Sequence, residues 1–220
     1  FDKSYFKEEL HFVDGVTYGG VSRETCEEMK KLGIPDPAWV PFGADTDVFQ
    51  LCHTVRPIRR IGFIGRNSHI SEAYQVKGID MFREICSQVG AEPVFIHDRA
   101  PEDMFTDIDL LMCCSEFEGG PLGIFEAASY GVPVLTRPVG NAQDIHGIKT
   151  FTSVEEAVKY IHEWEDIEKL RVYRDTVTED VRTHWSMKKC IETHLKPLIY
   201  SSGEFYDLIG IGTSDSSTKG

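Results

Sequence analysis

The clearest pattern in the sequence is a change of hydrophobic periodicity near residue 59. From there on, short apolar runs alternate with longer segments that have the spacing of amphipathic helices. Short apolar runs of this kind are typical of strands buried on both faces of a parallel sheet. The pattern predicts strands at 60–65, 93–97, 108–115, 132–136 and 149–152. It predicts helices at 78–89, 101–105, 121–130, 154–164, 166–183 and 186–200.

This alternation is typical of an α/β domain. Because connections between parallel strands are right-handed, the helices should cover both faces of the sheet, which makes a Rossmann-like domain of five or six strands. Ligands of such domains bind outside the carboxyl ends of the strands. Candidate functional residues are therefore expected at those ends.

A smaller unit precedes this domain. Residues 22–32 predict a helix, with acidic residues in its early turns and lysines in its last turn. The following segment has prolines and a glycine turn, which is typical of a chain that passes between domains, so the boundary is placed near residue 40. The chain is thus divided into a small unit over 1–38, a main domain over 39–203 and a flexible tail over 204–220.

Composition and charge narrow the possible partners. The chain has 220 residues, of which 41% are hydrophobic and 27% charged, as in an ordinary globular protein with one main domain. No apolar run approaches the roughly 20 residues of a membrane-spanning helix, so no integral membrane segment is expected. The net charge of −13 repels phosphate backbones and anionic lipids, so neither nucleic acid nor a membrane surface is an expected partner.

The cysteines and the first residues bear on location and completeness. The six cysteines show no C-x-x-C pair and no metal-ligand spacing, and we interpret them as reduced core residues of a cytoplasmic protein. The chain opens with FDKSYFKEEL, which is neither a signal peptide nor a start at Met. A fragment or a trimmed chain is expected.

Basic side chains gather in one part of this acidic chain. No acidic residue occurs over 48–71, a range that holds several arginines and histidines. Arg66 follows the first predicted strand and Lys77 comes just before the next helix, so both should face the carboxyl edge of the sheet and bind an anion. The remaining arginines are interpreted as lining a solvated linker: Arg56, Arg59 and Arg60.

A glycine-rich loop leads into a helix directly after the third predicted strand, in SEFEGGPLGIFEAASYG. Gly119 and Gly120 allow a ligand to approach the backbone closely, and Pro121 suits the first helical turn. The amides of Leu122 and Gly123 then lack intrahelical partners and should point outward. We expect this helix N-terminus to attract an anion, typically a phosphate.

Two glutamates accompany this terminus. Glu118 lies in the loop and Glu126 in the helix, with seven residues between them. Glu126 stands among apolar residues, so its charge needs a partner, and sugar hydroxyls would satisfy it. Taken singly, Glu118 reads equally well as a loop residue and Glu126 as part of a solvated helix face. Their place beside a phosphate-binding terminus favours a site.

These residues resemble the nucleotide-sugar donor domain of retaining glycosyltransferases of the GT-B fold, family 4 (group 1). The resemblance is carried by Arg66 with Lys77-Gly78, by the Glu118-x7-Glu126 pair and by PVGNAQDI after it, and it covers roughly residues 20–200. It implies an enzyme of the hexosyltransferase class with a nucleotide-diphosphate-sugar as donor and no separate cofactor. It also implies that 1–38 is a remnant of the N-terminal acceptor domain, the rest of which precedes residue 1 or belongs to another chain.

The resemblance assigns a role to each matched residue. Arg66 and Lys77 would hold the donor diphosphate, Glu118 would contact the transferred sugar, and Glu126 would bind the ribose. The implied catalytic residues are Glu118, Arg66 and Lys77, with no metal. The implied donor-binding residues are Arg66, Lys77, Glu118, Gly120, Pro121, Leu122, Gly123 and Glu126.

The chemistry agrees with these roles. Cleavage of a sugar–diphosphate bond leaves negative charge on the leaving group, which two cations and a helix N-terminus stabilise without a metal. A carboxylate beside the sugar favours the developing oxocarbenium charge. The stretch HDRAPEDMFTDID is shorter than the family's base-contacting loop, and the loop between Arg66 and Lys77 is longer than usual. A UDP- or GDP-sugar is expected, the acceptor is not identified, and the base is left open.

Two alternatives remain on the same residues. A sugar-nucleotide epimerase of the same fold would also place carboxylates and cations in this crevice. A non-catalytic nucleotide-sugar-binding module would keep the donor site without an acceptor domain. Conversion of a donor in the absence of acceptor would identify the epimerase.

Other polar motifs have ordinary interpretations. The Asp45-Thr46-Asp47 motif, which in another glycosyltransferase fold carries a metal, is interpreted as a turn or helix cap. His97 and Asp98 could shape a base pocket or form a strand-end pair, and His146 near Asp144 is interpreted as a loop residue without a role. Trp185 is predicted to be core.

Overall fold

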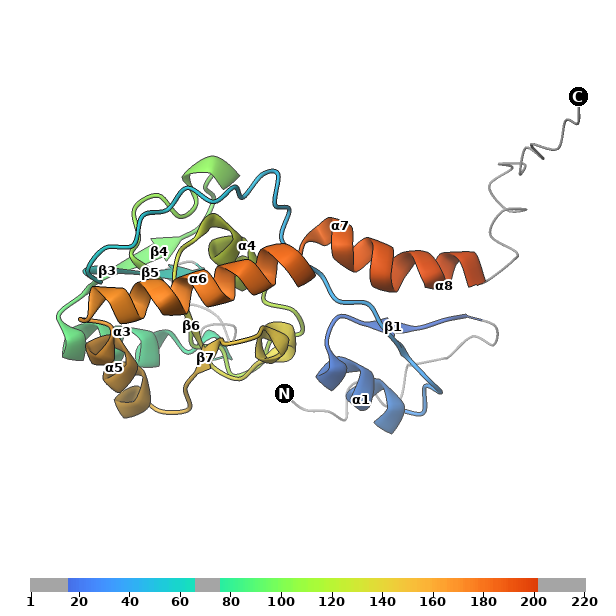
Figure 1. The fold of residues 1–220 in the computed structure, drawn as a ribbon. Helices are drawn as coiled ribbons and strands as arrows, with labels where there is room; N and C mark the ends of the chain where they lie inside the picture. Colours follow the sequence, from blue (N-terminus) through green and yellow to red (C-terminus); the bar gives the residue numbers. More distant parts are fainter. Residues whose placement is uncertain (1–15, 66–75, 202–220) are drawn as a thin grey trace, which may run out of the picture.

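The computed structural model describes residues 16–65 and 76–201 and contains a parallel five-stranded sheet. The strand order is β4-β3-β5-β6-β7, and every neighbouring pair is parallel (Figure 1). The strands are β3 (Arg60–Ile64), β4 (Glu92–Ile96), β5 (Leu110–Cys113), β6 (Val134–Thr136) and β7 (Lys149–Thr150). The direction of strand addition reverses between β3 and β5, which marks the topological switch point.

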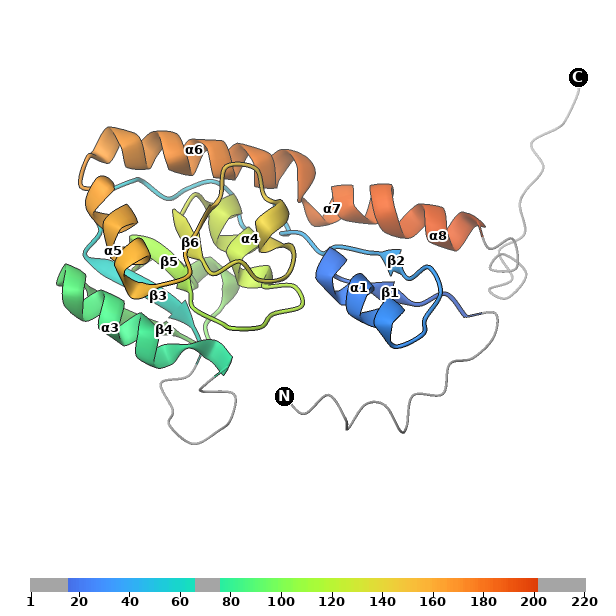
Figure 2. The ribbon, with the colours of Figure 1, turned by 90° about the horizontal axis from the view of Figure 1, so that it is seen from below.

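Helices cover both faces of this sheet. Helix α3 (Ile79–Val89) packs with α5 (Val154–Glu163) on one face, and α4 (Leu122–Tyr130) packs with α6 (Ile167–His184) on the other (Figure 2). Two short 3₁₀ helices lie in connections, η2 (Pro101–Asp103) and η3 (Gly140–Asp144). The expected fold class, an α/β Rossmann-like domain with helices on both faces, is confirmed.

A second, two-stranded parallel sheet lies at the N-terminal side. It pairs β1 (Gly19–Gly20) with β2 (Ala38–Trp39) across α1 (Arg23–Lys31). The Ser22 hydroxyl caps α1 by accepting from the Thr25 amide. The boundary near residue 40 stays a prediction, while residues 1–15 and 202–220 lie outside the described residues.

The last helical segments run beside the small sheet. They are α7 (Met187–Cys190), the π-helical η4 (Ile191–Leu195) and α8 (Lys196–Ser201), which form one rod in Figure 1. Trp39 joins the two regions, because its ring lies 4.8 Å from the His194 ring and 6.1 Å from the Trp185 ring, centroid to centroid. A Cβ atom on Gly43 would lie 1.9 Å from the Trp185 carbonyl oxygen, so this crossing point requires glycine.

The predicted elements match the observed ones apart from their ends. Strand β6 begins two residues later than predicted, because the Gly131 and Val132 amides donate to the Ala128 and Ala127 carbonyls and close α4. The C-terminal helix is interrupted by η4. Trp185 is buried and lies 5.4 Å from the Phe125 ring, which confirms it as core.

One cysteine differs from the prediction. Cys52 is exposed, because it lies in the extended segment that leads into β3. The others are buried or half-buried, and all six are free: Cys26, Cys52, Cys86, Cys113, Cys114 and Cys190. Among the described helices, none is long and apolar enough to cross a bilayer.

The arginines before β3 are not simply a solvated linker, which corrects the sequence interpretation. Asp109, at the start of β5, keeps only 3% of its surface exposed and pairs with the Arg56 guanidinium. Its other oxygen accepts from the Arg59 and Arg60 amides, each at 2.8 Å. The Arg60 side chain pairs with Asp107 and Glu92 at 3.3 and 3.2 Å. This network holds the segment at 56–60, which leads into β3, against the amino end of the sheet.

We expect Asp109→Ala to lower the free energy of unfolding by about 3 kcal/mol, because it removes a buried carboxylate and leaves two backbone amides and Arg56 without their acceptor. Urea unfolding monitored by circular dichroism measures the change. Asp47→Ala, at an exposed carboxylate, is the control and should shift the value by about 0.5 kcal/mol or less. Equal effects of the two substitutions would contradict the structural role of Asp109.

Candidate functional site

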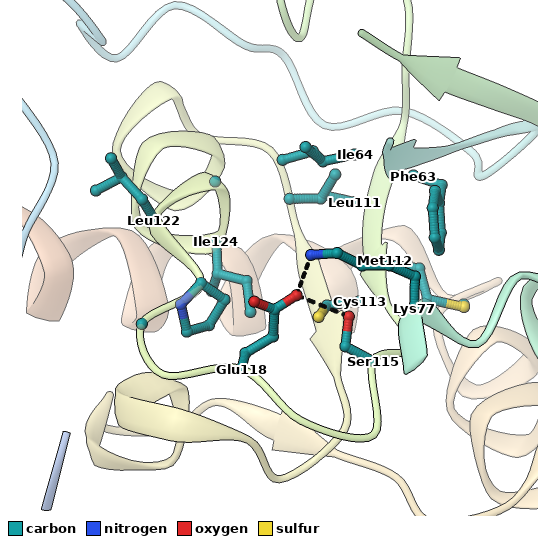
Figure 3. A pocket seen from close by; sticks show the side chains of 13 residues that line it. Phe63, Ile64, Lys77, Leu111, Met112, Cys113, Ser115, Glu118, Leu122 and Ile124 are labelled. Atoms are coloured by element: carbon teal, nitrogen blue, oxygen red, sulfur yellow. Dashed lines mark hydrogen bonds and ion pairs between the residues drawn. The ribbon is translucent and has the colours of Figure 1, made fainter. Parts of the chain in front are cut away.

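A pocket of about 160 Å³ opens at the carboxyl ends of β3 and β5, at the switch point of the sheet (Figure 3). Its floor is formed by strand residues and its walls by the segment before α3 and the loop before α4. The lining residues are Phe63, Ile64, Lys77, Leu111, Met112, Cys113, Ser115, Glu118, Gly120, Pro121, Leu122, Gly123 and Ile124. The pocket therefore gathers Lys77, Glu118 and the glycine-rich loop that the sequence singled out.

Lys77 is held at this edge by the backbone around it. The next residue, Gly78, has φ +68°, in the left-handed region that favours glycine. A Cβ atom there would lie 2.2 Å from the Cys114 carbonyl oxygen, so the chain before α3 packs directly on the end of β5. The Glu116 amide also donates to the Val76 carbonyl at 2.8 Å. These contacts turn Lys77 toward the loop after β5.

Glu118 is paired inside the pocket. Lys77 Nζ donates to Glu118 Oε1, and the Ser115 hydroxyl donates to the same oxygen at 2.9 Å. Figure 3 shows both side chains converging on that oxygen. Oε2 has no hydrogen-bond partner among the described residues. The Lys77 and Glu118 side chains keep 42% and 20% of their surfaces exposed, so a ligand can reach both.

The N-terminus of α4 differs in detail from the prediction. Pro121 has φ −74° and ψ 79°, the geometry of an inverse γ-turn, and it precedes the helix instead of opening it. In that turn the Leu122 amide donates to the Gly120 carbonyl at 2.8 Å, so it is not free, contrary to expectation. The Gly123 amide has no acceptor among the described residues. One predicted donor of the pair thus remains available at the pocket.

The loop that carries Glu118 is held from behind by PVGNAQDI. Gly140 has φ +51°, and a Cβ atom there would lie 2.6 Å from the Glu118 carbonyl and 2.7 Å from the Gly119 carbonyl. Asn141 is fully buried, and its Oδ1 lies 3.7 Å from where a Gly120 Cβ would stand. This close packing explains why two glycine-containing segments, far apart in the sequence, meet at the pocket.

Glu126 lies one turn into α4 and is not among the lining residues. It is half-buried, and burial raises the pKa of its carboxyl. No ion pair or hydrogen bond of this side chain occurs within 16–65 and 76–201. Arg66 lies outside the described residues. The roles of Glu126 and Arg66 therefore stay predictions.

Sequence reasoning missed Ser115. Its side chain keeps 2% of its surface exposed and reaches the Glu118 carboxylate from the end of β5. A serine at a strand end, three residues before a glutamate, is the only signal that the sequence holds for it. Cys113, on the pocket floor, was interpreted as a core residue, and burial raises the pKa of its thiol.

The remaining polar motifs behave largely as predicted. Asp45 Oδ1 accepts from the Asp47 and Val48 amides at 3.0 and 3.3 Å, which confirms a turn. His97 and Asp98 form an exposed pair at 3.4 Å.

In the described part of the chain, no group of three or more His, Cys, Asp or Glu side chains is arranged to hold a metal ion.

The raised pKa of Glu126 predicts a pH dependence. A carboxyl whose pKa is higher in the folded protein stabilises the fold below its unfolded-state pKa, and that contribution is lost as the pH rises through the folded-state pKa. We expect Glu126→Gln to raise the Tm at pH 7 by roughly 1 to 2 °C and to lose this advantage below the ordinary pKa of 4.5. Differential scanning calorimetry across this range measures it. The exposed Glu179→Gln should show no such trend.

Comparison with known proteins relates this chain to a fold. No protein-family model and no curated protein sequence matches it. Sucrose-phosphate synthase from Thermosynechococcus elongatus superimposes with a TM-score of 0.66 and 12% identity, over 90% of this chain and 59% of that one. HepE from Anabaena, solved in complex with UDP-glucose, has a TM-score of 0.64 and 15% identity, over 84% of this chain and 64% of that one.

A glycosyltransferase from Rickettsia africae is also similar, with a TM-score of 0.62 and 10% identity, over 90% of this chain and 66% of that one. This chain thus spans about three fifths to two thirds of each of these three proteins. At such identities the likeness concerns the fold. The architecture matches the Rossmann-like GT-B fold of these neighbours, as the sequence led us to expect.

Proposed function

We propose that this chain is the donor-binding part of a retaining glycosyltransferase that uses a nucleotide-diphosphate-sugar. The observation that carries the proposal is the Lys77–Glu118 pair in a pocket at the switch point, where Rossmann-like domains bind their ligands. The fold shared with a glycosyltransferase, and with HepE in complex with UDP-glucose, supports it. Family 4, retention and transfer of a hexose come from the sequence resemblance.

The pocket is suited to bind the diphosphate leaving group of the donor. Cleavage of the sugar–diphosphate bond leaves negative charge on the phosphate, and a fixed ammonium group and a free amide stabilise such charge. Lys77 Nζ and the Gly123 amide are two such donors among the described residues that line the pocket. Arg66, which follows β3 in the sequence, is assigned to the same diphosphate. These groups act without a metal, and no cofactor besides the donor is proposed.

Glu118 is assigned to the transferred sugar. Its Oε2, which has no partner among the described residues, is an acceptor for sugar hydroxyls, and its negative charge favours an oxocarbenium-like transition state. When a diphosphate enters, its oxygens compete with Glu118 for Lys77, since all of them are anionic acceptors. Donor binding thus exchanges an internal ion pair for one with the ligand.

The pocket holds only the reacting part of the donor. Its volume of about 160 Å³ lies below the roughly 300 to 1,000 Å³ of sites that enclose a drug-sized ligand. The nucleoside therefore extends beyond it. Glu126, one helical turn after Leu122 and half-buried, is the carboxylate that we assign to the ribose.

The rest of the reaction belongs to a larger assembly. We place the acceptor site in a further domain, of which β1, α1 and β2 are the described remnant, or in another chain. The isolated chain would then bind donor and stay inactive in transfer without that domain. A cytoplasmic location, with no nucleic acid or membrane as partner, is part of the same proposal.

Ligand-induced stabilisation tests the donor site. A thermal-shift panel with UDP, GDP, ADP and their sugar conjugates should give one responding base, since a ligand at 100 times its Kd adds about 2.7 kcal/mol to the free energy of unfolding. Lys77→Met should weaken binding of that nucleoside diphosphate about tenfold or more, because it removes a charged donor. Lys159→Met, at an exposed lysine of α5, is the matched control. A flat panel for the unmodified chain would refute the proposed function.

A further inference from the structure

Ser115 is a buried polar side chain that lines the pocket and has no role in the proposed reaction. It follows the last residues of β5, keeps 2% of its surface exposed and lines the pocket. Its hydroxyl donates to Glu118 Oε1 at 2.9 Å. A buried hydroxyl cannot turn toward bulk water, so its hydrogen bond constrains the carboxylate that it meets.

The two donors to Glu118 Oε1 differ in how firmly they are held. Lys77 has a long side chain that is 42% exposed, and the same ammonium group suits a diphosphate. Ser115 is short, buried and anchored at the end of a central strand. Once a diphosphate draws Lys77 away, Ser115 is the only remaining donor to this carboxylate among the described residues.

The backbone of the loop does not depend on this hydrogen bond. The Glu116 amide holds it to the Val76 carbonyl, and Gly140 packs on the Glu118 and Gly119 carbonyls. Loss of the Ser115 hydroxyl therefore frees the Glu118 side chain while the loop keeps its place. The role of Ser115 can be separated from a general role in folding.

We propose, on the basis of the proposed function, that Ser115 is a positioning residue that holds Glu118 Oε1 so that Oε2 faces the sugar of the donor. It acts through Glu118 and does not touch the diphosphate. Its removal should therefore affect recognition of the sugar and spare recognition of the nucleoside diphosphate.

The test compares Ser115→Ala with the unmodified chain by isothermal titration calorimetry. The probes are UDP with UDP-glucose, GDP with GDP-mannose and ADP with ADP-glucose, and the pair that the unmodified chain binds is used. We expect the Kd of the sugar nucleotide to rise about fivefold, as for the loss of one hydrogen bond, while the Kd of the nucleoside diphosphate stays within about twofold. Ser115→Thr, which keeps the hydroxyl, should restore the original ratio.

Two controls separate positioning from stability. Ser129→Ala removes an equally buried hydroxyl, which donates to the Phe49 carbonyl at 2.8 Å outside the pocket, and should leave both Kd values unchanged. In a Glu118→Ala background, adding Ser115→Ala should change neither Kd, because the residue through which it acts is gone.

The outcomes distinguish the two proposals. If the unmodified chain binds none of the three pairs, the proposed function fails and this role fails with it. If it binds a pair but Ser115→Ala leaves the sugar nucleotide unaffected, weakens both ligands equally, or adds to Glu118→Ala, the positioning role is wrong and the donor site stands.

Discussion

The ion pair between Lys77 and Glu118 is the contact on which the arrangement of the pocket depends. It joins the segment before α3 to the loop after β5, the two chain segments that flank the switch point of the sheet. Gly78 allows this contact, since any side chain there would collide with the Cys114 carbonyl. The pair also brings two opposite charges together in the pocket, so in the proposed function an anionic donor would replace an existing partner of Lys77.

The ion pair of the buried Asp109 at the other end of the sheet has a different character. Asp109 is enclosed at the start of β5, and both of its oxygens are engaged by Arg56 and by two backbone amides. Glu118 is more exposed than Asp109 and keeps one oxygen without a partner among the described residues. A fully engaged carboxylate holds structure together, while one with a spare acceptor beside an accessible cation is suited to a ligand. The sheet therefore has a structural charge network at its amino end and the proposed donor site at its carboxyl end.

Local sequence patterns account for most of the fold. The period of apolar residues identified every strand of the five-stranded sheet, the charge pattern located α1, and the glycine-rich loop located the start of α4. The errors occur where tertiary contacts override local preference. The predicted strand at 108–115 shortens to Leu110–Cys113, because the Ile108 carbonyl accepts from His53 and Arg56 and Asp109 turns its side chain to the arginines. These partners lie about 49 to 55 residues apart in the sequence, beyond the reach of any local pattern.

The amino-acid sequence by itself determined the order of strands and helices along the chain and the edge of the sheet where a site was expected. It also identified Lys77, Glu118 and the glycine-rich loop as candidate site residues. Only the tertiary structure decided that Lys77 and Glu118 pair and that the Ser115 hydroxyl donates to the same Glu118 oxygen. It also decided that the Leu122 amide donates to the Gly120 carbonyl within a turn. The physical reason is one of range. Periodicity and turn chemistry act over a few neighbouring residues, whereas the partner of a buried polar atom depends on distances between segments that meet only after the sheet has formed.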